Sequence, residues 1–222
     1  NNIGGAPAAF TNNWLVYRSR QTETARLSVQ AAADLDIGKY TVQCGQYEGD
    51  VKIGTVRKDK ARGGKKDDYF QLGKGKDGAW GGDGDDEMHG GGDADRLIGG
   101  AGDDTASGDA GNDRLFGGAG EDTLSGGAGK DQVKGGAGNA RAHGGAGADK
   151  IAGNGGDDVL RGEGANDRIV GGAGDDGLYG GPGNDRLIGG AGDDGLWGGV
   201  GDGVALGGPG AGTIAGGDGA DA

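Results

Sequence analysis

Residues 171–197 read GGAGDDGLY, GGPGNDRLI and GGAGDDGLW, which is one nine-residue unit repeated without a gap. Numbered within the unit, positions one, two and four are glycine, position six is Asp and position eight is a large aliphatic residue. The same frame extends over residues 63–222 without an insertion, giving about eighteen copies. Position six is Asp except at Ala140, Gly203 and Gly212. A phase kept over this length predicts a repetitive architecture.

The composition excludes an ordinary globular core. Of 222 residues, 61 are glycine, and the hydrophobic share of 32% is small and evenly spaced. The formal net charge of −13 disfavours nucleic acid as a partner and favours cations. No apolar run approaches the roughly 20 residues of a membrane span. The first residues carry no signal-peptide pattern and the last lie inside a repeat, so we expect a fragment of a longer chain.

The sequence divides into three segments. Residues 1–44 are expected to form a small β-rich cap on the first coil of the array, with the remnant of a preceding domain as the alternative. Residues 45–62 are the most basic stretch and are expected to be a transitional, solvated segment. Residues 63–222 form the repeat array. Within the cap, short β-branched or aromatic runs predict strands at 14–17, 25–29 and 39–43.

Within each copy, glycine at positions one, two and four permits positive φ, which predicts a tight six-residue turn followed by a three-residue strand. Side chains alternate along a strand, so position eight faces one side and positions seven and nine the other. Position eight is apolar in every copy, which predicts that this column is the core: Phe70, Ala79, Met88, Leu97, Ala106, Leu115, Leu124, Val133, Ala142, Ile151, Leu160, Ile169, Leu178, Leu187, Leu196, Ala205 and Ile214.

One aliphatic side chain in nine residues is a thin core, because its burial must offset the entropy of ordering the whole unit. Stacked turns would also bring carboxylates together, and these repel one another. Divalent cations between the turns would solve both problems. Carboxylate and carbonyl oxygens suit Ca²⁺, whereas structural Zn²⁺ would need Cys and His, of which the chain has Cys44 and two His. We therefore expect several calcium ions.

The repeat resembles the RTX, or haemolysin-type, calcium-binding nonapeptide G-G-x-G-x-D-x-U-x, over residues 63–222. The resemblance implies an all-β fold, a parallel β-roll, which is a right-handed β-solenoid with two nonapeptides per coil. Two sheets would enclose the position-eight column, and calcium would lie between turns on the same edge of successive coils. About nine coils at a strand spacing of ~4.8 Å would give a rod roughly 40 Å long.

The same resemblance assigns the calcium ligands to the position-six Asp residues, in two columns. One edge carries Asp68, Asp86, Asp104, Asp122, Asp158, Asp176 and Asp194, and the other carries Asp77, Asp95, Asp113, Asp131, Asp149, Asp167, Asp185 and Asp221. Calcium is in doubt beside the three copies that lack this Asp. Distorted turns are expected where glycine is replaced, at position four by Asp93 and Ala165 and at position two by Asp109 and Glu163.

Alternate copies fall on opposite sheets, so the outward residues can be sorted by face. One face combines basic residues at position seven with an apolar stripe at position nine, which predicts either self-association or a neighbouring protein. The alternative is that Arg stems cover the stripe. The basic residues are Arg96, Arg114, Lys150, Arg168 and Arg186, and the stripe comprises Trp80, Ile98, Phe116, Val170, Ile188 and Leu206. On the other face, a Thr/Ser run is too short to favour ice binding, and His89 and His143 are expected to be surface residues.

No metalloprotease, nucleophile-elbow or phosphate-loop motif occurs, and no His lies near Cys44 in sequence, so we expect no catalytic activity. The favoured function is a calcium-binding, secreted or cell-surface β-roll that is disordered without calcium and acts as a structural or interaction module in a surface layer, adhesin or matrix. The alternative is the C-terminal calcium-binding portion of a secreted enzyme, such as a protease or lipase, or of a pore-forming toxin.

Overall fold

The computed structural model describes residues 9–11, 14–17, 40–42 and 51–220, and these contain strands and turns but no helix. Thirteen strands form one sheet in the spatial order β1 (Ala9–Thr11), β2 (Trp14–Tyr17), β3 (Tyr40–Val42), β4 (Val51–Ile53), β6 (Tyr69–Lys74), β8 (Glu87–Gly92), β10 (Thr105–Ala110), β12 (Thr123–Ala128), β14 (Arg141–Ala146), β16 (Val159–Gly164), β18 (Gly177–Pro182), β20 (Gly195–Val200) and β22 (Thr213–Asp218). Nine strands form the second sheet, in chain order β5 (Lys60–Arg62), β7 (Gly78–Asp83), β9 (Arg96–Ala101), β11 (Arg114–Ala119), β13 (Gln132–Ala137), β15 (Lys150–Gly155), β17 (Arg168–Ala173), β19 (Arg186–Ala191) and β21 (Val204–Leu206).

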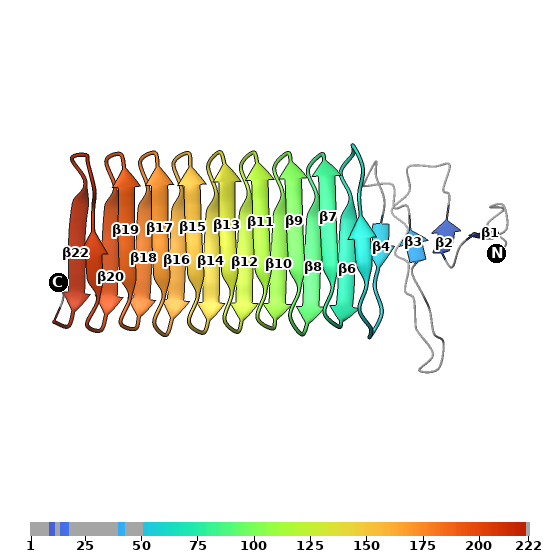
Figure 1. Cartoon of the computed structure of the whole chain (residues 1–222), viewed down its shortest axis with the longest axis horizontal. Coiled ribbons are helices and arrows are strands. Elements are labelled where there is room, and N and C mark those ends of the chain that lie inside the picture. The colour runs from blue at the N-terminus through green and yellow to red at the C-terminus, as the bar shows by residue number, and fades with distance from the viewer. Residues whose placement is uncertain (1–8, 12–13, 18–39, 43–50, 221–222) are drawn as a thin grey trace, which may run out of the picture.

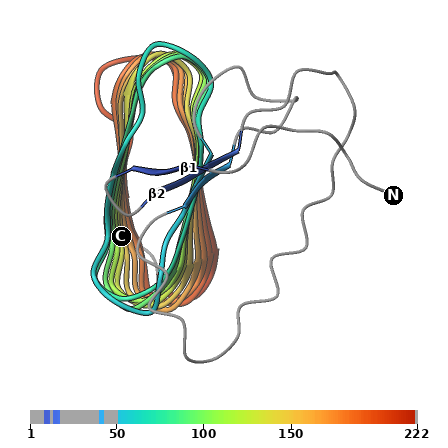
Figure 2. The ribbon, with the colours of Figure 1, turned by 90° about the vertical axis from the view of Figure 1, so that its right-hand side faces the viewer.

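From β4 onward the chain alternates between the two sheets, so each coil consists of one strand from each. The result is a parallel β-solenoid of about nine coils, consistent with a right-handed roll. Figure 1 shows the strands stacked along the length of a rod. Viewed along the rod, the coils superimpose as a flattened oval with a turn at each end (Figure 2). The predicted β-roll with two nonapeptides per coil is confirmed.

Each position of the repeat forms a straight column along the rod. Leu115 pairs with Leu97 on one side and with Val133 on the other, and these neighbours lie 18 residues apart in sequence. An 18-residue coil therefore places identical repeat positions side by side. This register lets one Asp or one Arg per coil become a ladder.

The strands are longer than the repeat pattern predicted. Most contain six residues, from position seven of one copy to position three of the next, as in Arg96–Ala101. The glycine-rich positions join the ladder, since Gly100 pairs with Gly118 and Ala101 with Ala119. The prediction of a six-residue turn and a three-residue strand is wrong, because glycine at positive φ, such as Gly100 at 138°, still extends and pairs.

The position-eight column is the core, as predicted, from Phe70 to Leu196. Most of its large members are fully buried between the two sheets. Two members differ at the C-terminal end, where Ala205 is partly buried and Ile214 is 52% exposed. Ile214 lies in the last described coil, which is covered from one side only.

The roll register begins before residue 63. Strand β4 pairs in parallel with β6, and β5 pairs with β7, so residues 51–62 supply the first strands of both sheets. Ala61 is buried in phase with position eight and Asp59 in phase with position six. The early copies depart from the glycine pattern and still adopt the coil, because the apolar and acidic positions keep their spacing.

Two of the predicted N-terminal strands are observed, as β2 and β3. Together with β1 they continue the thirteen-stranded sheet beyond β4, at one end of the rod (Figure 1). The predicted strand at 25–29 lies outside the described residues. Within the described ranges, no helix is long and apolar enough to cross a membrane.

The alternating burial makes a direct prediction. Leu115→Ala, which removes a fully buried side chain, should lower the free energy of unfolding in calcium by about 2–5 kcal/mol. Phe116→Ala, one residue further on the outer face, should cost less. Urea unfolding in saturating calcium measures both losses, and equal losses would contradict the assignment of position eight to the core.

Candidate metal sites at the turns

The acidic residues predicted as ligands lie in two columns, one at each end of the oval. The turns that lead into the thirteen-stranded sheet form the Asp68 edge, and those that lead into the nine-stranded sheet form the Asp77 edge. Every predicted ligand from Asp68 to Asp194 is buried, with 1 to 5% of its surface exposed. Asp221 lies outside the described residues. Unpaired carboxylates are rarely buried to this degree, so these columns need an explanation.

One oxygen of each position-six carboxylate from Asp77 to Asp194 joins its coil to the preceding one. The Asp86 amide N–H donates to Asp104 Oδ1 at 2.9 Å, and on the other edge the Asp95 N–H donates to Asp113 Oδ1 at 2.7 Å. The same bond recurs along both columns at a separation of 18 residues. Position six is therefore a structural acceptor that fixes the turn of the neighbouring coil.

The second oxygen is buried and accepts no hydrogen bond from the described residues in twelve of these carboxylates: Asp77, Asp86, Asp95, Asp104, Asp113, Asp131, Asp149, Asp158, Asp167, Asp176, Asp185 and Asp194. A buried acceptor without a donor costs free energy, and more so when it is charged. Twelve equivalent oxygens in two columns therefore mark a repeated site for a positively charged partner.

Backbone carbonyls converge on the same place. A Cβ added to Gly99 would collide with Asp104 Oδ2 and with the carbonyl oxygen of Gly117 in the next coil. The arrangement repeats at Gly171, with Asp176 Oδ2 and a carbonyl oxygen of the next coil. Position one is glycine because any side chain would fill the space into which these oxygens point. The sequence predicted that this glycine is needed for backbone freedom. In the structure it is needed because no room is left for a side chain.

Burial raises the pKa of the position-six carboxyls from Asp77 to Asp185. It reaches about 7 at Asp86, Asp95, Asp104 and Asp167, chiefly through desolvation. Hydrogen bonds from the backbone oppose the rise, and neighbouring carboxylates of the column add to it. Without a metal, the charged form of these carboxyls is therefore unfavourable near neutral pH. A positive charge nearby would stabilise the charged form.

The raised pKa values predict that acid promotes folding of the calcium-free chain. Between the ordinary value of 3.8 and about 7, the folded state binds more protons than the unfolded state, so stability falls as pH rises through this window. Lowering the pH from about 8 to about 5 in chelator should therefore increase the β-sheet circular dichroism signal. Asp86→Asn combined with Asp104→Asn keeps the Oδ1 acceptors and should weaken the effect. A signal that rises toward alkaline pH would contradict the prediction.

A second polar column at position five was missed from the sequence. The Asp103 N–H donates to Asp85 Oδ1 at 2.8 Å, so position five caps the following coil while position six caps the preceding one. Asn serves equally well, since the Asp157 N–H donates to Asn139 Oδ1 at 2.8 Å. The signal was present in the recurrent Asp-Asp and Asn-Asp pairs. Each such turn is thereby tied to both of its neighbours.

Position five also makes the two edges electrostatically different. On the Asp68 edge it is acidic in most coils: Asp67, Asp85, Asp103, Glu121, Asp157, Asp175 and Asp193. On the Asp77 edge it reads Lys76, Ala94, Asn112, Lys130, Ala148, Asn166, Asn184 and Asp202. All of these acidic side chains are exposed. One edge therefore carries two carboxylate columns and the other carries one.

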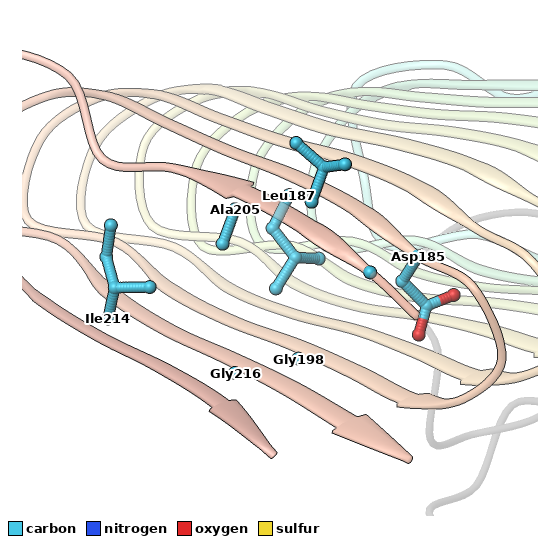
Figure 3. A pocket seen from close by; sticks show the side chains of 8 residues that line it. Asp185, Leu187, Gly198, Ala205, Ile214 and Gly216 are labelled. Atoms are coloured by element: carbon cyan, nitrogen blue, oxygen red, sulfur yellow. The ribbon is translucent and has the colours of Figure 1, made fainter. Parts of the chain in front are cut away.

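The copies without Asp at position six interrupt the columns in different ways. Ala140 is buried where the carboxylate would stand, and its own N–H still donates to Asp158 Oδ1 at 2.7 Å. In the C-terminal coils, Gly203 and Ala205 line a hollow of about 140 Å³ with Asp185, Leu187 and Ile214 (Figure 3). A second hollow of about 200 Å³ lies beside Gly212. The absence of the Asp side chain at Gly203 and Gly212 thus leaves hollows in the C-terminal coils.

The glycine replacements keep the turn geometry that was expected to distort. Asp93, Asp109, Glu163 and Ala165 all adopt positive φ, between 68° and 80°, as does Asn154, which the sequence analysis overlooked. Asp and Asn tolerate this region better than most residues, whereas Glu and Ala are strained there. The coil register imposes the conformation, so strain rather than distortion results.

Both histidines lie on the thirteen-stranded sheet beside carboxylates. His89 Nε2 is 3.0 Å from Glu87 Oε1, and His143 Nδ1 is 2.9 Å from Glu163 Oε1. Neither belongs to a turn. Among the described residues, no group of three or more His, Cys, Asp or Glu side chains lies close enough together to hold a metal ion. Side-chain carboxylates alone therefore do not supply a full coordination shell at the turns.

At the turns that carry a position-six Asp, the atoms that could bind a metal are a buried carboxylate oxygen and a nearby backbone carbonyl oxygen of the next coil. An all-oxygen set with flexible geometry fits Ca²⁺. A family model described as the RTX calcium-binding nonapeptide repeat (4 copies) matches residues 53–88, 80–115, 107–141, 143–178 and 178–205. The chain belongs to this RTX family. No curated protein matches it. The match begins ten residues before Gly63, in agreement with the early start of the RTX roll.

Restoring the missing carboxylate tests the columns. In Ala140→Asp, the new Oδ1 should accept the Asp122 N–H, and its partner oxygen should complete the column of the Asp68 edge. The variant should unfold at a higher temperature in calcium and be less stable in chelator, where one more buried carboxylate lacks a cation. Ala140→Asn, which adds the acceptor without the charge, is the matched control. A shift of the same sign in both conditions would contradict a cation at this edge.

Proposed function

We propose that this RTX roll is a calcium-driven folding module that works outside the cell, with the position-six Asp residues as ligands. The observation that supports this most strongly is the set of twelve buried carboxylate oxygens without a hydrogen-bond donor. Their burial is unfavourable in the metal-free chain and favourable with a divalent cation. Calcium binding would therefore supply part of the free energy of folding.

The calcium concentration differs between the cytosol and the outside of the cell, and this difference would control folding. Extracellular calcium modules work at affinities on the order of 10⁻⁴–10⁻³ M, far above cytosolic calcium levels. A chain of this kind stays unfolded where calcium is scarce and becomes a stiff rod where it is abundant. This sequence has a single Cys, so no disulfide can form within it. Bound ions would take the place of disulfides as the links between coils.

The role we propose for the folded rod is structural, in a surface layer, adhesin or matrix, and not catalytic. Its two broad faces are flat sheets whose outward residues form regular columns. The hollows lie at the C-terminal coils and are lined mainly by glycine and aliphatic residues, with a single buried Asp in each. A regular surface of this kind suits contact with another extended surface.

Calcium removal tests the proposal. A calcium titration of the chelated chain should produce a cooperative rise in β-sheet circular dichroism, and excess chelator should reverse it. Magnesium at the same concentration should be a poor substitute, because it demands near-ideal octahedral geometry. A chelated sample at neutral pH that keeps the β-sheet signal would refute calcium-driven folding.

A further inference from the structure

A basic ladder runs along the outer face of the nine-stranded sheet, beside the Asp77 edge. It consists of Arg96, Arg114, Lys150, Arg168 and Arg186, one cation per coil, with neutral Gln132 at its centre. All of these side chains are exposed. In the part of the chain that the structure describes, none of them forms an ion pair with a carboxylate. The predicted basic face is therefore present, and its charges are unmatched.

An acidic ladder of the same period runs along the Asp68 edge. Its members are the exposed position-five carboxylates, interrupted at neutral Asn139. One oxygen of Asp157 accepts the Asp175 N–H at 2.8 Å, and Asp175 does the same for Asp193. These bonds hold one oxygen of each side chain in place, while the residues remain exposed. The acidic ladder is thus a preorganised row of negative charge.

The two ladders cannot meet within one molecule. Each basic residue begins a six-residue strand, and the acidic residue of the same coil follows the end of that strand. At about 3.3 Å per residue, the strand separates them by about 20 Å. Salt at physiological strength screens exposed charges over such a distance. The attraction is therefore available only to another molecule.

The order of charges along the two ladders matches. With two parallel copies at the same height, Arg96 faces Asp103, Arg114 faces Glu121, Lys150 faces Asp157, Arg168 faces Asp175 and Arg186 faces Asp193. The neutral interruptions also coincide, Gln132 with Asn139 and, at the end, Val204 with Ala211. An antiparallel arrangement would instead place Val204 against Asp67. The one mismatch in the parallel arrangement is Gly78 against Asp85.

We propose that RTX rolls of this chain associate side by side in parallel, the acidic ladder of one copy lying along the basic ladder of the next. The inference rests on the proposed calcium-driven folding, because unfolded chains have no ladders. Both ladders have one charge per coil, so their spacing is identical in every copy. A foreign polyanion would not carry a neutral position opposite Gln132, whereas a second copy carries Asn139 there. The match therefore favours a second copy as the partner.

The contact uses a different surface on each partner, so each bound copy still offers one free ladder. Such heterologous contacts grow into open arrays instead of closing as dimers. The apolar stripe borders the basic ladder, with Trp80 at 42% and Leu206 at 48% exposure, and Arg96 lies 4.5 Å from the centre of the Phe116 ring. Aromatic packing therefore holds part of the basic ladder in place before any partner arrives.

Sedimentation velocity in calcium tests the proposal. The protein should assemble in about 20 mM salt and dissociate in about 500 mM salt, because the pairs are exposed. Arg114→Gln with Arg168→Gln removes two of the five cations of the basic ladder. Asp157→Asn with Asp175→Asn removes two of the seven charges of the acidic ladder and keeps the caps, as Asn139 does. Each double variant alone should assemble at least about tenfold more weakly, although their net charges change in opposite directions.

Mixing the two double variants distinguishes the proposal from a general charge effect. Each variant retains intact the ladder that is weakened in the other, so the mixture should favour one-to-one dimers over longer assemblies. Arg141→Gln with Arg161→Gln removes two charges from the opposite face and should leave assembly unchanged. Circular dichroism in calcium checks that every variant is folded.

The outcomes separate the two proposals. A wild-type chain that folds in calcium and stays monomeric at low salt overturns the side-by-side association and leaves the proposed function intact. A chain that does not fold in calcium refutes the proposed function. Assembly that needs the basic ladder but survives the Asp→Asn changes also overturns the inference, since the basic ladder would then bind an anion other than the acidic ladder.

Discussion

In the described residues, every coil up to Asp194 buries a carboxylate, and the rest of the structure is arranged around that constraint. From Asp77 to Asp194, Oδ1 of the position-six Asp accepts an N–H from the preceding coil, as in Asp104, and Oδ2 lies beside the glycine and carbonyl backbone of the turns. These contacts hold each turn against the next, while the pairing of the parallel strands sets the spacing of the coils. A solenoid with a core of one aliphatic side chain per unit gains its rigidity at the edges, where polar atoms are concentrated.

The glycines are best understood through the carboxylates. Position one is glycine because a side chain there would collide with an Asp oxygen and a carbonyl, whereas positions two and four are glycine because the backbone takes positive φ. The exceptions agree with this division. Asp93, Asp109 and Asn154 tolerate positive φ at positions two and four, while position one accepts a large residue only at Leu72, near the start of the roll, where the side chain is buried in the core.

The two edges share one buried column and differ in the exposed one. Strict 18-residue register turns a modest bias at position five into an acidic row on one edge, interrupted at Asn139, and a bias at position seven into a basic row on the adjacent face. Isolated surface charges contribute little to stability or binding. When such charges repeat at a fixed spacing, they form a row that can pair with another row of the same spacing.

The sequence by itself determined the nine-residue period, the position-eight core and the recurrent Asp at position six, because each is a strict periodicity, and the β-roll with its two Asp columns was implied by the resemblance to the RTX repeat. The tertiary structure alone decided the strand length, the early start at β4 and the position-five caps. These depend on which backbone groups face one another across coils, and a single repeat does not reveal that. It also decided which oxygen of each Asp is left without a donor: the carboxylate's role was visible in the repeat, but its orientation is fixed by contacts 18 residues away.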